Sequence, residues 1–438
     1  MSKKLKLGMF YMPCGHHITA WRHPEVPADS GMNIDHIVEV AKLAERGLFD
    51  MFFMADSVTF WRGTLEAMTR DSLTAWIDPF TVMASLAQHT KNIGLICTAT
   101  STFDTPYALA RRFASLDRAS GGRAGWNLVT SGNKTEAWSF GLDEIVDKAE
   151  RYSRAEEFAH AVRGLWNSWD EDAFIFDKET GVFFDKDKMH VLEHQGQFYR
   201  CKGPLNVPFS AQGEPVQVQA GASEAGKKLA ASSAEVVFAA SPNIEHAKAF
   251  YTDVKGRLAA HGRSPNDMAI MPGLSVTVGE TSDEAAEKHE ELQELIDPTT
   301  GLQILSDRLD FDLSGYDVDG PLPEIPITQA GGSRAELLIE TAKKNNLTIK
   351  QLYREIAGTR GHMQITGTPK DVADMMEQWL VEGACDGFNL LPALFPNSLK
   401  DFVDLVIPEL QNRGLFRTEY EATTLRGNLG LNRPAFKA

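Results

Sequence analysis

The segment Cys14-Gly-His-His17 holds the densest group of reactive side chains in the sequence, one thiol and two imidazoles. An imidazole changes its charge near neutral pH, so His16 and His17 are candidates to donate or accept a proton, with Cys14 beside them. Adjacent histidines can also bind a metal ion, but the chain contains no H-E-x-x-H motif. We expect an acid–base or pocket-lining role without a metal. A solvated loop and a metal-dependent hydrolase are the alternatives.

A second segment, Pro215–Lys228, is typical of a site for a phosphate group. A strand-like run leads through Gly221 into a helix that Ser223 is placed to cap, and the backbone amides at a helix start attract anions. Gly221–Lys227 fits the G-x-x-x-x-G-K part of a nucleotide-binding loop, but Lys228 follows where Ser or Thr would bind magnesium. We therefore expect a phosphate site that does not hydrolyse nucleoside triphosphates. An ordinary capped helix is the alternative.

Polar side chains also end or interrupt three apolar runs. Asp56 closes the run 49–56, and several hydroxyl groups begin with Thr98 at the end of another. Trp126 and Asn127 break a third run. A buried Asn needs hydrogen-bond partners, which either the neighbouring backbone or a bound ligand with amide-like edges would supply. These positions predict the rim of a binding site, although Thr also favours strands for steric reasons.

The elements that must position these residues alternate between apolar strand-like runs and amphipathic helices, the pattern of a parallel α/β protein. The helical periodicity is clearest over 34–48, 155–169 and 372–380, where Met and Trp fall on the core face. We predict strands at 5–11, 49–55, 93–100, 123–130, 215–220, 235–240, 270–278 and 386–391. Eight strands, each followed by a helix, predict a (β/α)8 TIM barrel whose catalytic rim lies at the carboxyl ends of the strands.

Such a barrel needs about 250 residues, so much of this chain must be insertion within a single domain spanning 1–438. Three stretches without regular periodicity are the candidates: 57–77, 170–213 and 297–366. Long insertions in a compact domain commonly serve as lids or interfaces. Because 57–77 follows a strand directly, we expect it to overhang the site and wall a substrate pocket. A satellite core or a dimer contact is the alternative.

Composition narrows the class of protein. With 43% hydrophobic residues, the chain can bury a large core, and no run approaches the roughly 18 apolar residues of a membrane span. A net charge of −16 argues against nucleic acid and membrane surfaces as partners. Four scattered cysteines and the absence of a signal-peptide pattern predict a cytoplasmic protein. No G-x-G-x-x-G follows a strand, so we expect no NAD-binding module.

Beyond these patterns, an ordered set of motifs resembles the flavin-dependent monooxygenases related to nitrilotriacetate monooxygenase. This branch of the bacterial-luciferase-like superfamily includes dibenzothiophene sulfone and long-chain alkane monooxygenases. The resemblance covers nearly the whole chain, with motifs at Ser120–Ser131, Trp21–Pro24, Glu150–Tyr152, Leu165–Asp170, Gln219–Glu224, Pro408–Leu415 and Thr424–Arg426. It implies a luciferase-like barrel that binds reduced FMN, which a separate NAD(P)H:flavin reductase supplies.

The resemblance also implies roles for individual residues. The family's flavin-contacting positions are matched, in chain order, by Asp56, Thr98, Tyr152 and Ser223. Ser223 and the helix start would hold the phosphate with the Tyr152 hydroxyl, while Asp56 and Thr98 would line the cavity of the isoalloxazine ring. Asn127 lies in the matching strand motif and is a further cofactor-binding candidate.

Two departures from the family pattern affect these roles. Lys148 stands where members often carry His, four residues before the Tyr of the E-R-Y motif. A fixed cation still suits a phosphate, so Lys148 stays a cofactor-binding candidate. Gly132 stands where some members carry His, so a proton-transfer role at that position is not matched. Cys14 and His17 match pocket-lining positions of alkane-oxidising relatives, and His17 or His16 is our candidate for moving a proton.

The implied function is that of a two-component monooxygenase. Reduced FMN reacts with O2 to form a flavin C4a-(hydro)peroxide, and one oxygen atom enters a small organic substrate. Family members commonly form homodimers or homotetramers, which we expect here as well. The alternatives are a deazaflavin-dependent oxidoreductase of the same superfamily and a non-catalytic flavin-binding protein. The motifs do not identify the substrate.

Overall fold

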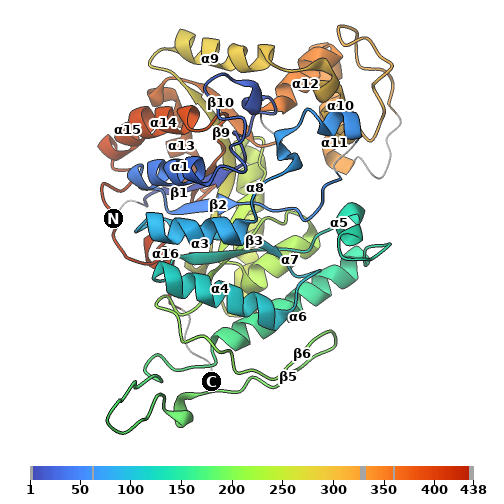
Figure 1. The fold of residues 1–438 in the computed structure, drawn as a ribbon. Coiled ribbons are helices and arrows are strands. Elements are labelled where there is room, and N and C mark those ends of the chain that lie inside the picture. Colours follow the sequence, from blue (N-terminus) through green and yellow to red (C-terminus); the bar gives the residue numbers. More distant parts are fainter. Residues whose placement is uncertain (1–2, 62–63, 326–331, 359–360, 434–438) are drawn as a thin grey trace.

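A computed structural model describes residues 3–61, 64–325, 332–358 and 361–433 and shows a closed barrel of eight parallel strands (Figure 1). Around the barrel the order is β1-β2-β3-β4-β7-β8-β9-β11, and β11 pairs with β1. The strands are β1 (Lys6–Tyr11), β2 (Met51–Met54), β3 (Gly94–Thr100), β4 (Ala124–Val129), β7 (Val216–Gln219), β8 (Val236–Ala239), β9 (Ala269–Val278) and β11 (Gly387–Leu390). All eight predicted strands and the (β/α)8 TIM barrel are confirmed.

Helices cover the outside of the barrel. The long ones are α1 (Ile34–Arg46), α3 (Pro79–His89), α4 (Pro106–Ser120), α6 (Lys148–Trp166), α7 (Glu224–Ser233), α8 (Ile244–Arg257), α9 (Ser282–Glu294) and α13 (Pro369–Val381). A mixed α- and π-helical run closes the set with α14 (Asn397–Asp401), η6 (Phe402–Val406) and α15 (Ile407–Asn412). The three predicted helical stripes belong to α1, α6 and α13, although Trp169 of the second stripe lies beyond the end of its helix.

The two residues of the Trp–Asn motif of β4 lie on opposite faces of the barrel wall, because successive side chains of a strand point to opposite faces. Trp126 points outward and packs between Phe113 of α4 and Phe158 of α6, with ring centroids 5.9 and 6.0 Å away. Its indole N–H donates to the Ala99 carbonyl oxygen at 3.0 Å. Asn127 therefore points into the barrel, together with inward residues such as Ile96 of β3.

The C-terminal segment closes the amino end of the barrel. Leu425, at the start of α16 (Leu425–Asn428), is fully buried within the inner core. A Cβ on Gly94 would lie 2.3 Å from Leu425 Cδ1, so glycine at this inward position makes room for the leucine. The neighbouring Arg426 bonds the Glu235 carboxylate and donates to the Gln212 carbonyl oxygen at 3.0 Å. These bonds fix the C-terminal segment around α16, which we call the C-terminal plug, to the barrel wall.

The three stretches expected as insertions carry their own elements. Residues 57–77 hold α2 (Leu65–Met68) and η2 (Ser72–Thr74), and 170–213 hold a two-stranded arm, β5 (His194–Gln195) and β6 (Arg200–Cys201), which extends from the barrel (Figure 1). The third holds α10 (Pro298–Leu309), α11 (Gly332–Asn345) and α12 (Ile349–Ala357). Strand β10 (Met363–Gly367), which was not predicted, pairs with β9 outside the barrel.

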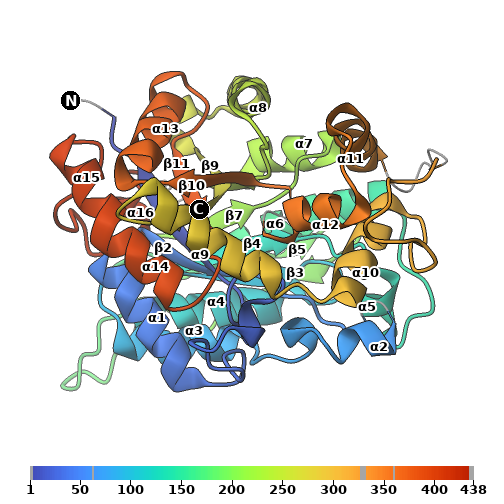
Figure 2. The ribbon, with the colours of Figure 1, turned by 90° about the horizontal axis from the view of Figure 1, so that it is seen from above.

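Helices α5 (Lys134–Trp138), α10, α11 and α12 lie on the same side of the barrel in both views (Figures 1 and 2).

Within the part of the chain that the structure describes, no helix combines the length and apolar character needed to cross a membrane.

Candidate active site

Thr98 and Asn127 form a buried polar pair inside the barrel, near the carboxyl ends of β3 and β4. The two residues are direct neighbours in the strand register. Asn127 Nδ2 donates to Thr98 Oγ1 at 2.8 Å, and Thr98 Oγ1 donates to the Met54 carbonyl oxygen at 2.9 Å. Asn127 Oδ1 is buried and has no hydrogen-bond partner among the described residues. The hydrogen bond to Thr98 thus fixes the Asn127 amide with Oδ1 as an acceptor that a ligand N–H would satisfy.

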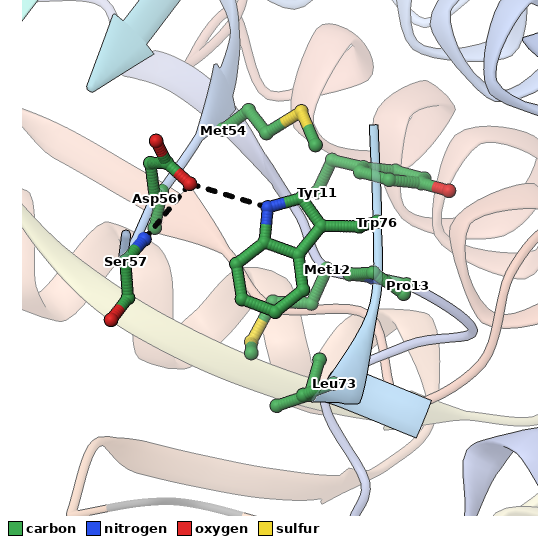
Figure 3. Close-up of a pocket in the computed structure, with 9 residues that line it drawn as sticks. Tyr11, Met12, Pro13, Met54, Asp56, Ser57, Leu73 and Trp76 are labelled. Carbon is green, nitrogen blue, oxygen red and sulfur yellow. Dashed lines mark hydrogen bonds between the residues drawn. The ribbon is translucent and has the colours of Figure 1, made fainter. Parts of the chain in front are cut away.

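Asp56 lies at the rim, in a cavity of about 160 Å³ where β1 and β2 end (Figure 3). The Trp76 indole N–H donates to Asp56 Oδ1 at 3.3 Å, and the Ser57 backbone N–H donates to the same oxygen at 2.9 Å. Leu73 lines the cavity below Trp76, while Tyr11 and Met54 contribute from the strands. Residues of the 57–77 stretch therefore form one wall of this space, which we call the Asp56 cavity.

The loop after β1 places Cys14, His16 and His17 in different surroundings. His16 Nε2 lies 2.9 Å from the Phe10 carbonyl oxygen, and its ring meets the inward Phe10 ring edge-on. His17 Nδ1 lies 2.8 Å from Thr19 Oγ1, and its ring packs beside Gly358 after α12. Cys14 is fully buried, and burial raises the pKa of its thiol, which disfavours a thiolate. The two imidazoles are thus the stronger candidates for moving a proton.

The predicted phosphate turn forms at the start of α7. Ser223 Oγ accepts from the Gly226 N–H at 3.2 Å and lies 3.4 Å from the Tyr152 hydroxyl of α6. A Cβ on Gly221 would lie 3.0 Å from Gly226 Cα, so the glycine spacing reflects a close backbone approach. Lys227 is held by Asp253 at 2.6 Å and also pairs with Glu224. The turn therefore offers a hydroxyl pair at the start of a helix, while the Lys227 ammonium is engaged by carboxylates instead of being available as in a nucleotide-binding loop.

The two departures from the family pattern occupy the start of α6 and the end of β4. Lys148 is exposed at the first turn of α6, and Tyr152 follows four residues later on the same helical face. A Cβ on Gly132 would lie 3.2 Å from Arg151 Nη2, so the Arg151 guanidinium borders the place of the missing histidine. The structure thus places a permanent cation at that edge.

Sequence reasoning missed two polar residues of the barrel interior, Asn389 and His362. A Cβ on Gly8 would lie 2.6 Å from Asn389 Oδ1, and one on Gly273 would lie 2.4 Å from His362 Nδ1. The His362 ring stacks on the inward Phe238 ring with centroids 5.1 Å apart. A glycine inside a strand pattern signals close approach by another group, and Gly8 and Gly273 were available as that signal.

Among the described residues, no group of three or more His, Cys, Asp or Glu side chains is arranged to hold a metal ion. The polar groups instead form separate sets around one end of the barrel: the Thr98–Asn127 pair, the Tyr152–Ser223 pair and the Asp56 cavity.

The sequence pattern of the luciferase-like monooxygenases matches residues 9–386. The chain belongs to this family. It is 48% identical to N-acetyl-S-(2-succino)cysteine monooxygenase of Bacillus subtilis (strain 168), over 99% of this chain and 98% of that protein. It is 47% identical to nitrilotriacetate monooxygenase component A of Aminobacter aminovorans, again over 99% and 98%. Among solved structures it resembles a riboflavin lyase with modified FMN and riboflavin, with a TM-score of 0.85, 29% identity, and 98% and 97% of the two chains covered.

Family membership and this level of identity to named monooxygenases make the chain a flavin-dependent monooxygenase of the luciferase-like family. The resemblance inferred from the sequence motifs is thereby confirmed. The assignments of individual site residues stay predictions, and they enter the proposal below.

Proposed function

We propose that this protein is the oxygenating component of a two-component monooxygenase that uses reduced FMN and O2. The observation that carries the proposal is that two polar pairs open at one end of the barrel. Asn127 Oδ1, buried and without a partner among the described residues, suits an N–H of a flavin ring. The Ser223 turn with the Tyr152 hydroxyl 3.4 Å away suits its phosphate. These residues fit FMN.

When bound, reduced FMN supplies two electrons to O2, so that one oxygen atom enters the substrate and the other leaves as water. The protein's own residues have narrower tasks. Thr98 orients the Asn127 amide, and Asp56 places a carboxylate at the rim. Ser223 at the start of α7 and Tyr152 of α6 hold the phosphate, with Lys148 one turn before Tyr152 at the start of α6. Buried side chains around the Asp56 cavity exclude bulk water, while His16 or His17 holds or moves the proton that oxygen transfer requires.

A second protein is implied because the chain shows no dinucleotide-binding motif of its own. The relative from Aminobacter aminovorans is named component A, which points to a separate partner component in that system. We therefore propose that an NAD(P)H:flavin reductase supplies reduced FMN, and that the chain itself assembles as a homodimer or homotetramer. Size-exclusion chromatography with light scattering measures the second part of this proposal.

The phosphate assignment is tested by a Ser223→Ala/Tyr152→Phe double variant. We expect FMN affinity, measured by fluorescence quenching, to fall about ten-fold or more, because two hydroxyl contacts are removed. Affinity for riboflavin, which lacks the phosphate, should stay unchanged. Ser153→Ala, an exposed position on α6, is the matched control. Equal FMN affinity in the double variant and the control would remove the phosphate assignment.

The reaction class is tested with purified protein, FMN, a flavin reductase and NADH. N-acetyl-S-(2-succino)cysteine and nitrilotriacetate are the first compounds to examine, because relatives of 48% and 47% identity are named for them. An oxygenated product that carries label from ¹⁸O2 supports the proposal. Peroxide release with every compound, or tighter binding of a reduced deazaflavin than of reduced FMN, would favour one of the two alternatives.

A further inference from the structure

A second cavity, of about 250 Å³, adjoins the Asp56 cavity; we call it the outer cavity. Its walls come from two separate stretches of the chain: Met68 and Asp71 precede Leu73, while α10 and Ile356 of α12 face them. Leu73 lines both cavities (Figure 3 shows its side facing Trp76). Its side chain therefore separates the two spaces.

The backbone around Leu73 is well anchored. The Leu73 N–H donates to Asp71 Oδ1 at 2.9 Å, and Thr74 Oγ1 donates to the Met68 carbonyl oxygen at 2.9 Å. The Leu73 side chain is only 8% exposed. Because the turn is held by its neighbours, a change of the Leu73 side chain alters the partition while the anchoring hydrogen bonds stay.

The loop after β1 runs beside both cavities. Met12 and Pro13 line the Asp56 cavity, and Ile18 lines the outer cavity. The candidate proton-transfer residues His16 and His17 lie between them in the sequence. His17 also packs against Gly358, two residues after Ile356 of the outer cavity. A molecule that spans the two cavities would thus pass along the segment that carries these imidazoles.

Volume favours joint use of the two spaces. Pockets for small organic ligands begin at about 300 Å³, and neither cavity alone reaches that size. The two together exceed it. A substrate of ordinary size therefore needs both cavities, or needs one cavity together with the barrel mouth.

The walls of the outer cavity indicate the chemistry of its occupant. Ile18, Met68 and Leu73 supply an apolar side, while α10 presents Thr300, Gln303 and Asp307 at helical spacing. Among the described lining residues, Arg308 is the one cation, and Asp71 and Asp307 supply two carboxylates. Gln303 Nε2 donates to Asp307 Oδ1 at 2.7 Å, which leaves the Gln303 amide oxygen facing a ligand. With two carboxylates and one guanidinium, the wall is a poor site for a carboxylate group, so the two polycarboxylates named above would have to bind in the Asp56 cavity and the barrel mouth instead. It fits an apolar chain that ends in a neutral hydrogen-bonding or zwitterionic group.

We propose that the outer cavity binds the non-reacting end of the substrate, an amphipathic chain with a neutral or zwitterionic polar end, and that Leu73 controls which chain lengths are accepted. This inference rests on the proposed function, because it assigns the reacting atom to the flavin side of Leu73. Thr300 and Gln303 hydrogen-bond the polar end, and the apolar side chains enclose the middle of the chain.

The first experiment uses ω-(methylthio)alkan-1-ols with two to eight carbons as probes and measures sulfoxide formation with FMN, reductase and NADH. We expect Leu73→Trp to lower kcat/KM for the six-carbon probe about ten-fold and to leave the two-carbon probe unchanged, because the bulkier side chain blocks the passage. Leu73→Ala should raise kcat/KM for the longer probes. Leu65→Ala, at an exposed site of the same stretch, is the control. Equal effects of Leu73→Trp on short and long probes would overturn the proposal.

The second experiment needs no turnover. Thr300→Cys places a thiol in the wall of the outer cavity, and Thr299→Cys places one at the exposed neighbouring position. In FMN-loaded protein, the six-carbon probe should slow methanethiosulfonate labelling of the first variant about three-fold and leave the second unchanged. Equal labelling rates with and without the probe would overturn the proposal. Protection without any sulfoxide would support the binding site while contradicting the proposed oxygenation.

Discussion

The Thr98–Asn127 pair allows structural and cofactor-binding roles to be separated by substitution. Thr98→Val keeps the shape of the side chain but removes the hydroxyl that accepts from Asn127 Nδ2 at 2.8 Å and donates to the Met54 carbonyl oxygen at 2.9 Å. Both partners are then left buried without this bond, at about 1–3 kcal/mol each. We expect the free energy of unfolding to fall by about 2–4 kcal/mol.

Combining Thr98→Val with Asn127→Leu removes the stranded amide as well. Replacing both members of a buried hydrogen bond by apolar groups of similar shape is far less costly than removing one. The double variant should therefore regain about 1–2 kcal/mol relative to Thr98→Val, a coupling that urea unfolding followed by circular dichroism can measure.

FMN affinity should not follow this recovery. If Asn127 Oδ1 accepts from the flavin ring, every variant without the amide leaves a flavin N–H unpaired, and the dissociation constant should rise about ten-fold. Fluorescence quenching of FMN measures it. A double variant that regains stability and binds FMN within two-fold of the wild type would refute the placement of Asn127 against the flavin.

Three further predictions concern stability and reactivity. Leu425→Ala should lower the free energy of unfolding by about 3 kcal/mol, because a fully buried leucine is lost from the inner core, whereas exposed Leu65→Ala should change it by less than about 0.5 kcal/mol in thermal unfolding. Burial raises the pKa of Asp117 to about 6, so its protonated form stabilises the fold below about pH 4 and this stability is lost as pH rises through 6. We therefore compare the free energy of unfolding of Asp117→Asn with that of the wild type by urea unfolding. From pH 4 to pH 7.5 the difference should shift by about 2–3 kcal/mol in favour of the variant; a difference that stays constant with pH would contradict the raised pKa. N-ethylmaleimide should modify buried Cys14 more than about ten-fold more slowly than half-buried Cys201 at pH 7.5, by peptide mapping; equal rates would show an accessible thiolate.

The barrel could be predicted from the sequence because fully buried strands leave continuous apolar runs. Strand β10 escaped because Met363–Gly367 is short and mostly half-exposed, so its residues carry little apolar signal. The arm strands β5 and β6 have two residues each, too few for a period to show. Their places depend on packing that no local pattern encodes.

The site was predictable to the extent that its residues end predicted strands. Asp56, Thr98 and Asn127 were proposed in this way, and the Ser223 turn was proposed from its helix start. The glycine spacing of that turn was interpreted as anion binding, whereas the structure adds a steric cause, the contact between Gly221 and Gly226. The partner of Asp56 is Trp76, 20 residues away, and such pairings follow from the insertion's fold alone.

Buried charged groups hold the C-terminal segment at the amino end of the barrel, and buried amides in its interior bear on where function lies. At the amino end, Arg426 bonds Glu235 and three backbone carbonyl oxygens. Asp117 there accepts from Ser210, Gln212 and the Ala124 N–H. These charges are buried with partners that hold the C-terminal plug in place. In the interior, by contrast, neither amide atom of Asn389 has a partner among the described residues.

A buried amide without partners costs about 1–3 kcal/mol, which a fold tolerates when a bound molecule recovers it. Asn389 and Asn127 both face the barrel interior, and the phenyl rings of Phe10 and Phe238 lie there with the imidazoles of His16 and His362. An apolar lining with a few unsatisfied amides is the composition expected of a cofactor pocket rather than of a core. Two of the unsatisfied amides therefore lie in the part of the barrel where the flavin is proposed to bind, while Arg426 and Glu235 form a charge pair at the amino end.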